Sequence, residues 1–108
     1  MTHPSKRKGN NWERELVFHA NESGLPAERA YASNGRALGE CDAVDVKIDG
    51  KCVQAKRRAA LPAYLQVPDG CDAVAFRQDR GEPLVLITLW EWLDLVKDRG
   101  GRSEVLQD

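Results

Sequence analysis

The chain has 108 residues, which is enough for one hydrophobic core and too few for two independent ones. Hydrophobic residues make up 42% and charged residues 31%, and no apolar run is long enough to cross a bilayer, so the composition excludes a disordered chain and a membrane-spanning one. The net charge is −1, yet residues 1–58 hold 11 lysines and arginines against 8 acidic residues, whereas residues 59–108 hold 5 against 9. A basic surface in the first half, suited to a nucleic acid, is therefore compatible with the nearly neutral total.

The N-terminal residues and the cysteines both indicate an intracellular protein. Residues 1–9 are polar and basic, and no apolar stretch follows them as it does in a secretory signal, so we expect a flexible basic arm and a cytoplasmic location. The cysteines, Cys41, Cys52 and Cys71, have neither the even number of a disulfide framework nor the paired spacing of a zinc site. We expect all three to be reduced.

The first predicted element is a helix that has Asn10 or Asn11 as its N-cap and runs to about residue 22, where Ser23-Gly24 provides a stop signal. Leu16 and Ala20 lie on one apolar face of this helix. One turn earlier, the same face carries Glu13. The sequence therefore places a carboxylate at the end of the stripe that faces the core.

A short strand near residues 29–32 and a polar loop are expected next, followed by the clearest pattern in the chain. Residues 42–57 alternate between apolar and polar on both sides of Asp49-Gly50, which predicts a strand, a tight turn and a returning strand. A turn of even length pairs residues whose numbers sum to 99, so Asp45 is expected to face Gln54 directly. A three-residue turn would shift the register and move Asp45 to the other face.

The two faces of this hairpin are predicted to differ in chemistry. Lys56 shares the polar face with Gln54, because alternate residues of a strand point to the same side. The apolar residues point to the opposite face: Val44, Val46, Val53 and Ala55.

The second half is expected to contain a short helix at residues 59–65 and strands at residues 72–77 and 84–87. The order of helices and strands predicts an α/β fold in which a central mixed sheet is flanked by helices. No repeat or linker divides the chain, so we expect residues 10–108 to form a single domain.

The last predicted element is a helix from Leu89 to about Lys97, with Thr88 as its N-cap and Gly100-Gly101 beyond its end. Its apolar residues cover a wide surface: Leu89, Trp90, Trp92, Leu93, Leu95 and Val96. We expect such a surface to contact both the core and a partner.

The polar residues of the helix and hairpin are suited to phosphodiester hydrolysis, which needs an oriented water molecule and positive charge for the transition state. Mg²⁺ prefers oxygen ligands, commonly one or two carboxylates with several waters, and Glu13 and Asp45 are of that type. A nearby lysine such as Lys56 can orient water or stabilise developing charge. A solvated sheet face with cross-strand polar pairs also fits Asp45, and an ion pair with a lysine or arginine also fits Glu13.

Two short basic runs, at residues 6–8 and 56–58, are candidate phosphate contacts, although such runs also occur on ordinary solvated surfaces. The loop at residues 33–35 has the composition of a turn, and a polar loop that leads into the hairpin can also touch a phosphate.

At the start of the chain, Arg7-Lys8-Gly9 is followed, after three residues, by Glu-Arg-Glu-Leu-Val at residues 13–17. This pattern resembles the start of the archaeal-type Holliday junction resolvases, which belong to the PD-(D/E)XK nuclease superfamily. In those proteins the corresponding helix supplies the first catalytic glutamate. By this match that residue is Glu13, the same carboxylate that the helical stripe indicates.

Three later segments extend the resemblance in the same order. Arg29 followed by Ser33 is similar to the family's arginine-and-serine segment, and Val44-Asp45-Val46 is similar to its aspartate strand. Gln54-Ala55-Lys56 stands where the family has Glu-x-Lys. The resemblance covers about residues 6–60.

The resemblance implies a restriction-endonuclease-like fold, dependence on Mg²⁺ with Mn²⁺ as a substitute, and a homodimer that cuts a four-way DNA junction symmetrically, as in DNA recombination or repair. It implies that Glu13, Asp45 and Gln54 hold the metal and that Lys56 completes the catalytic set. The candidate DNA contacts are Arg7, Lys8, Arg29, Ser33, Arg57 and Arg58.

Two departures from the family pattern affect the expected site. Gln54 replaces the usual glutamate, which keeps a carbonyl oxygen but removes a negative charge, so we expect weaker metal affinity. The spacing from Asp45 to Gln54 is shorter than in the archaeal proteins, which makes Asp42 the second choice for the metal-binding aspartate. The alternatives to a junction resolvase are another repair or restriction-type nuclease on the same fold and a non-catalytic nucleic-acid-binding module.

Overall fold

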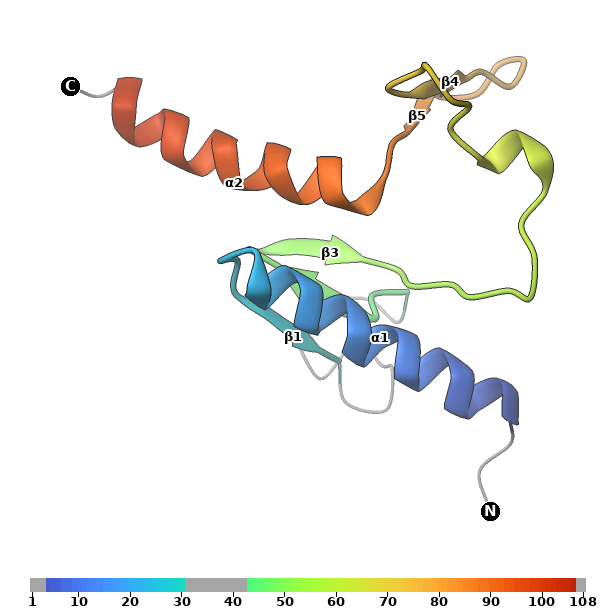
Figure 1. The fold of residues 1–108 in the computed structure, drawn as a ribbon, viewed down its shortest axis with the longest axis horizontal. Coiled ribbons are helices and arrows are strands. Elements are labelled where there is room, and N and C mark those ends of the chain that lie inside the picture. The colour runs from blue at the N-terminus through green and yellow to red at the C-terminus, as the bar shows by residue number, and fades with distance from the viewer. Residues whose placement is uncertain (1–3, 31–42, 107–108) are drawn as a thin grey trace. The chain divides into compact units, whose positions relative to one another are not determined.

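The computed structural model describes residues 4–30 and 43–106 (Figure 1). Contacts within the chain form two compact units, Met1–Arg57 and Arg58–Asp108. In the described residues, the first unit holds helix α1 and strands β1 to β3, and the second holds a short 3₁₀ helix, strands β4 and β5, and helix α2. The single nuclease domain expected for residues 10–108 stays a prediction.

Helix α1 spans Pro4–Glu22. Proline fits the first turn of a helix, where its missing N–H loses no hydrogen bond, and the lysines and arginine that follow it are good helix formers. A Cβ at Gly9 would meet nothing within 4 Å, so this glycine is not required by close packing. Because α1 begins at Pro4, the predicted start at residue 10 or 11 is wrong, and residues 4–9 of the expected arm form the first turns of the helix.

The C-terminus of α1 is closed by a Schellman motif. Gly24 has a φ of 90°, its N–H donates to the Asn21 carbonyl at 3.0 Å, and the Leu25 N–H donates to the Ala20 carbonyl at 3.0 Å. Leu25 and Ala20 are both buried, which supplies the hydrophobic contact that accompanies this motif. The predicted stop at Ser23-Gly24 is confirmed, and the chain turns from here into β1.

The first sheet has the order β1-β2-β3, with β1 at Ala27–Arg29, β2 at Val46–Ile48 and β3 at Lys51–Val53, and both strand pairs are antiparallel. Asp49 and Gly50 have φ values of 49° and 80°, as a two-residue type I′ turn requires. The pairs run from Ile48 with Lys51 to Val46 with Val53, so the register that sums to 99 is confirmed for these strands.

The core of the first unit lies where α1 contacts β1 and β2. Val46 and Ile48 on the middle strand are fully buried, because alternate residues share the face that is covered. The other buried apolar residues of this unit are Leu16, Ala20, Leu25, Ala30 and Val44. Leu16 and Ala20 therefore face the core as predicted, and Glu13 lies one turn before them.

The second unit begins with a 3₁₀ helix, η3, at Ala63–Leu65, which is shorter than the helix expected at residues 59–65. Strands β4 (Val74–Phe76) and β5 (Leu84–Leu86) then pair antiparallel in a second sheet. These strands lie within the two predicted ones and are shorter at their ends.

Helix α2 spans Leu89–Leu106. The Thr88 hydroxyl accepts a hydrogen bond from the Glu91 N–H at 3.2 Å, which confirms Thr88 as the N-cap. The predicted end near Lys97 is wrong, because the helix continues through Gly100-Gly101. Glycine lowers helix stability by about 1 kcal/mol but does not by itself exclude helical dihedral angles, so a glycine pair is a weaker stop signal than a proline.

The chain is thus a mixed α/β protein with two long helices and two small antiparallel sheets in the part that the structure describes. The sequence predicts one central sheet with both parallel and antiparallel strand pairs. The described strand pairs of the two sheets are all antiparallel, so the central mixed sheet stays a prediction. No helix in the described ranges has the length and apolar character needed to cross a membrane.

Candidate functional site

Asp45 is held by the backbone of both neighbouring strands. Its carbonyl accepts a hydrogen bond from the Ala30 N–H at 2.8 Å, which continues the β1–β2 ladder by one residue. Its N–H donates to the Val53 carbonyl at 2.9 Å, although Val53 is already the partner of Val46. Two consecutive residues therefore lie opposite one residue of β3, which is the arrangement of a β-bulge.

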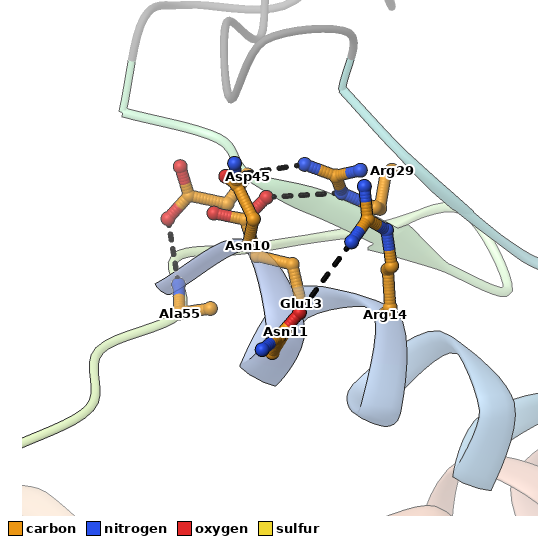
Figure 2. Close-up of polar contacts among 7 residues, drawn as sticks. All are labelled: Asn10, Asn11, Glu13, Arg14, Arg29, Asp45 and Ala55. Atoms are coloured by element: carbon orange, nitrogen blue, oxygen red, sulfur yellow. Dashed lines mark hydrogen bonds and ion pairs between the residues drawn. The ribbon is translucent and has the colours of Figure 1, made fainter. Parts of the chain in front are cut away.

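The bulge changes how Asp45 meets the returning strand. The paired register ends at Val46 and Val53, so the direct pair of Asp45 with Gln54 that the sequence predicts is not formed. Instead, Asp45 Oδ2 accepts a hydrogen bond from the Ala55 N–H at 2.8 Å (Figure 2). Because Ala55 lies between Gln54 and Lys56, this bond fixes the Asp45 carboxylate next to the segment that carries both.

Exposure alternates along this segment, as the sequence predicts. Val53 and Ala55 are half-buried, whereas Gln54 and Lys56 are exposed. Among the described residues, neither Gln54 nor Lys56 has a hydrogen bond or ion pair. Both residues are therefore exposed on either side of the residue whose N–H bonds to Asp45.

Glu13 is the buried charged residue of the described part of the chain, with 5% of its surface exposed. Its Oε1 forms an ion pair with Arg29 Nε at 3.2 Å, and Arg29 Nη2 also donates to Asn10 Oδ1 at 3.3 Å (Figure 2). Arg29 thus ties two positions of α1 to strand β1. Of the two interpretations left open by the sequence, the ion pair of Glu13 with an arginine is formed.

Arg29, the ion-pair partner of Glu13, and Asp45 come from different strands but lie at neighbouring positions of the sheet. Arg29 on β1 pairs with Val46 on β2, and the next residue, Ala30, bonds to Asp45. Glu13 reaches this place from α1, which contacts both strands. The fold therefore brings the carboxylate of the helix and the carboxylate of the hairpin to the same region.

The oxygen donors here have the chemistry that Mg²⁺ requires. Within the ranges that the structure describes, no three His, Cys, Asp or Glu side chains form a group that could hold a metal ion. The oxygen donors available in this region are the Glu13 and Asp45 carboxylates and the Gln54 carbonyl oxygen, and one or two carboxylates with water at the other positions is a common way to bind Mg²⁺ in proteins. This donor set fits Mg²⁺, and Glu13 can join it by sharing or releasing its ion pair with Arg29.

The other predicted site residues are more scattered. Arg7 is exposed and Lys8 half-buried on the first turns of α1, and Arg57 and Arg58 are exposed after the hairpin. Ser33 and the second-choice aspartate, Asp42, lie outside the described residues.

The sequence indicates Asn10 only as a possible N-cap and does not predict that it accepts a hydrogen bond from Arg29. Asn10 lies inside α1, three residues before Glu13, so both side chains face the same way and both reach Arg29. The signal that could have found it is this spacing, once the helix is allowed to begin before residue 10.

Comparison of the chain with protein-family models, with curated proteins and with solved structures found no match. The resemblance of residues 6–60 to junction resolvases therefore stays a prediction. Function is therefore inferred from the geometry of Glu13, Arg29 and Asp45 and of the segment that carries Gln54 and Lys56.

Proposed function

We propose that the protein is a Mg²⁺-dependent endonuclease that cleaves branched DNA, with a four-way junction as its substrate and a homodimer as its active form. One observation carries the proposal: the buried Glu13 carboxylate and the Asp45 carboxylate come from separate elements to one region, and exposed Gln54 and Lys56 flank the residue to which Asp45 is bonded. Two carboxylates, an amide oxygen and a lysine suit phosphodiester hydrolysis.

Each residue has a defined task in this proposal. Glu13, Asp45 and the Gln54 carbonyl oxygen hold Mg²⁺, with Mn²⁺ as a substitute. When bound, the cation supplies positive charge to the scissile phosphate and lowers the pKa of an attacking water. Lys56 orients that water or stabilises the charge that develops on the phosphate oxygens. The basic residues at the start of α1 and after the hairpin contact neighbouring phosphates.

The fold that accompanies this function is restriction-endonuclease-like, with one central mixed sheet flanked by helices. The antiparallel β1–β3 sheet packed on α1, with Asp45 at the end of β2 that is remote from the turn, supports this assignment. A homodimer would present two copies of the site to the two symmetrically placed strands of a junction.

The test incubates the full chain with labelled four-way junction, flap and duplex DNA, with and without Mg²⁺. We expect symmetrical junction cuts that need Mg²⁺ and that Asp45→Asn and Lys56→Ala reduce by at least about a hundredfold, since each change removes a group that acts on the reacting phosphate. Lys51→Ala is the matched control, because Lys51 is an exposed lysine of the same hairpin outside the site, and this variant should cut at the wild-type rate.

Other outcomes separate the alternatives. Cleavage of duplex as fast as junction would indicate a repair or restriction-type nuclease of the same class. Junction binding without cleavage at any Mg²⁺ or Mn²⁺ concentration would indicate a non-catalytic nucleic-acid-binding module. Equal loss of activity in Lys51→Ala and Lys56→Ala would contradict the role given to Lys56.

A further inference from the structure

The ion pair between Glu13 and Arg29 occupies a carboxylate that the proposed function assigns to a metal. The side chains of Arg29 and Glu13 are 24% and 7% exposed, so both groups have lost most of their contact with water. A carboxylate in such a place needs a counter-charge, since burial of an unpaired charge is strongly unfavourable. Arg29 provides that charge at 3.2 Å.

Arg29 is held in this position from two sides. Its backbone pairs with Val46 in the sheet, and its Nη2 donates to Asn10 Oδ1 at 3.3 Å, in addition to the contact of Nε with Glu13. An arginine that served mainly to contact a DNA phosphate would extend its guanidinium into solvent. Arg29 instead directs it at two side chains of α1 (Figure 2).

We propose that Arg29 is the built-in counter-ion of Glu13, which neutralises this carboxylate before a metal enters and competes with the divalent cation for it. This inference rests on the proposed function. The guanidinium and the cation are both positive and both seek the same carboxylate, so each weakens the binding of the other. Together with the uncharged Gln54, Arg29 makes the metal-free site only weakly negative.

The test measures Mn²⁺ binding to the full chain by titration calorimetry, without DNA. We expect Arg29→Gln to bind Mn²⁺ about tenfold more tightly than the wild type, within the usual range of coupling between two ligands. Arg29→Lys keeps the positive charge and should stay close to the wild type. Arg14→Gln removes an exposed arginine of α1, whose contact is with Asn11, and should also leave the Kd unchanged.

A thermodynamic cycle tests whether the change in Mn²⁺ affinity comes from the interaction of Arg29 with Glu13. In a Glu13→Gln background the carboxylate is gone, so Arg29→Gln should no longer change the Kd for Mn²⁺. A second readout is thermal unfolding: Arg29→Gln should have a lower Tm than the wild type without metal and should regain more of it on addition of Mn²⁺. If Arg29→Gln is unfolded without metal, saturating Mn²⁺ should restore its helical circular dichroism, because the cation replaces the missing counter-charge.

The outcomes distinguish this inference from the proposed function. A wild type that binds no Mn²⁺ overturns the proposed function and the inference together. A wild type that binds Mn²⁺, with Arg29→Gln equal or weaker in affinity, leaves the proposed function intact and overturns the inference alone. Failure of Mn²⁺ to refold an unfolded Arg29→Gln chain also overturns the inference.

Discussion

Gln54 determines how much negative charge the candidate site offers a cation. It is exposed, and its amide can supply a carbonyl oxygen but no charge. We expect Gln54→Glu to lower the Mg²⁺ concentration for half-maximal cleavage by roughly tenfold, because a third carboxylate strengthens the binding of a divalent cation. The measurement is a titration of junction cleavage with Mg²⁺.

The matched control for this change is Gln66→Glu, which adds the same charge at an exposed glutamine of the second unit. It should leave the Mg²⁺ requirement unchanged. An unchanged requirement in Gln54→Glu itself would mean that Gln54 does not contact the metal.

Arg29 and Glu13 show what could be predicted at the level of single residues. Glu13 was found because its place on an apolar helical stripe is a local property of the sequence. Its partner was not predictable, because Arg29 lies 16 residues away and reaches Glu13 only through the packing of β1 against α1. A contact of this kind depends on tertiary packing, which no short pattern encodes.

Among the elements, the turn of the β2–β3 hairpin sets the register of these two strands, and its glycine is required by backbone geometry alone. Gly50 has a φ of 80°, and a Cβ there would meet nothing within 4 Å. We expect Gly50→Ala to lower the free energy of unfolding by about 1 kcal/mol, because a residue with a Cβ is strained at this φ. Urea unfolding followed by circular dichroism measures the change.

Gly9→Ala is a control for which the opposite change in the free energy of unfolding is expected. It too has open space around the position of a Cβ, but it lies inside helix α1. Gly9→Ala should raise the free energy of unfolding by roughly 0.5–1 kcal/mol, because alanine is the better helix former. If both alanine variants shift stability in the same direction, the type I′ turn or the helical state of Gly9 is wrongly assigned.

Some features of the strands and helices were predictable from local sequence patterns, and others were not. The register of β2 on β3 was predictable, because Asp49 and Gly50 tolerate the positive φ values of a two-residue turn. The bulge at Asp45 was not, because it depends on hydrogen bonds to Ala30 and Val53, whereas strict alternation simply continues the ladder. Helix α1 begins before its predicted start and helix α2 continues past its predicted end, whereas the C-terminus of α1 and the N-cap of α2 lie where they were predicted.

For the whole molecule, the proposed homodimer can be tested on α2, whose large apolar side chains Leu95 and Trp90 are 56% and 55% exposed. We expect the wild type to have twice the 12.0 kDa mass of the chain in solution. Leu95→Glu should shift the protein to the monomer, because a charged residue at an apolar interface is costly to bury. Size-exclusion chromatography with light scattering gives both masses.

Lys97→Glu, an exposed charge change on the same helix, should leave the dimer intact. A Leu95→Glu chain that stays dimeric would place the dimer interface elsewhere. A monomeric Leu95→Glu chain should also lose coordinated cutting of the two junction strands while it still nicks one.

The boundary between the two units, after Arg57, has a consequence for how such a protein can evolve. Glu13, Arg29, Asp45, Gln54 and Lys56 all precede it, so under the proposed function the hydrolytic chemistry is inherited as one contiguous block of coding sequence. Mutation or genetic exchange beyond Arg58 can then vary substrate preference and self-association while the reacting groups stay intact. New targets become accessible to descendants without rebuilding catalysis.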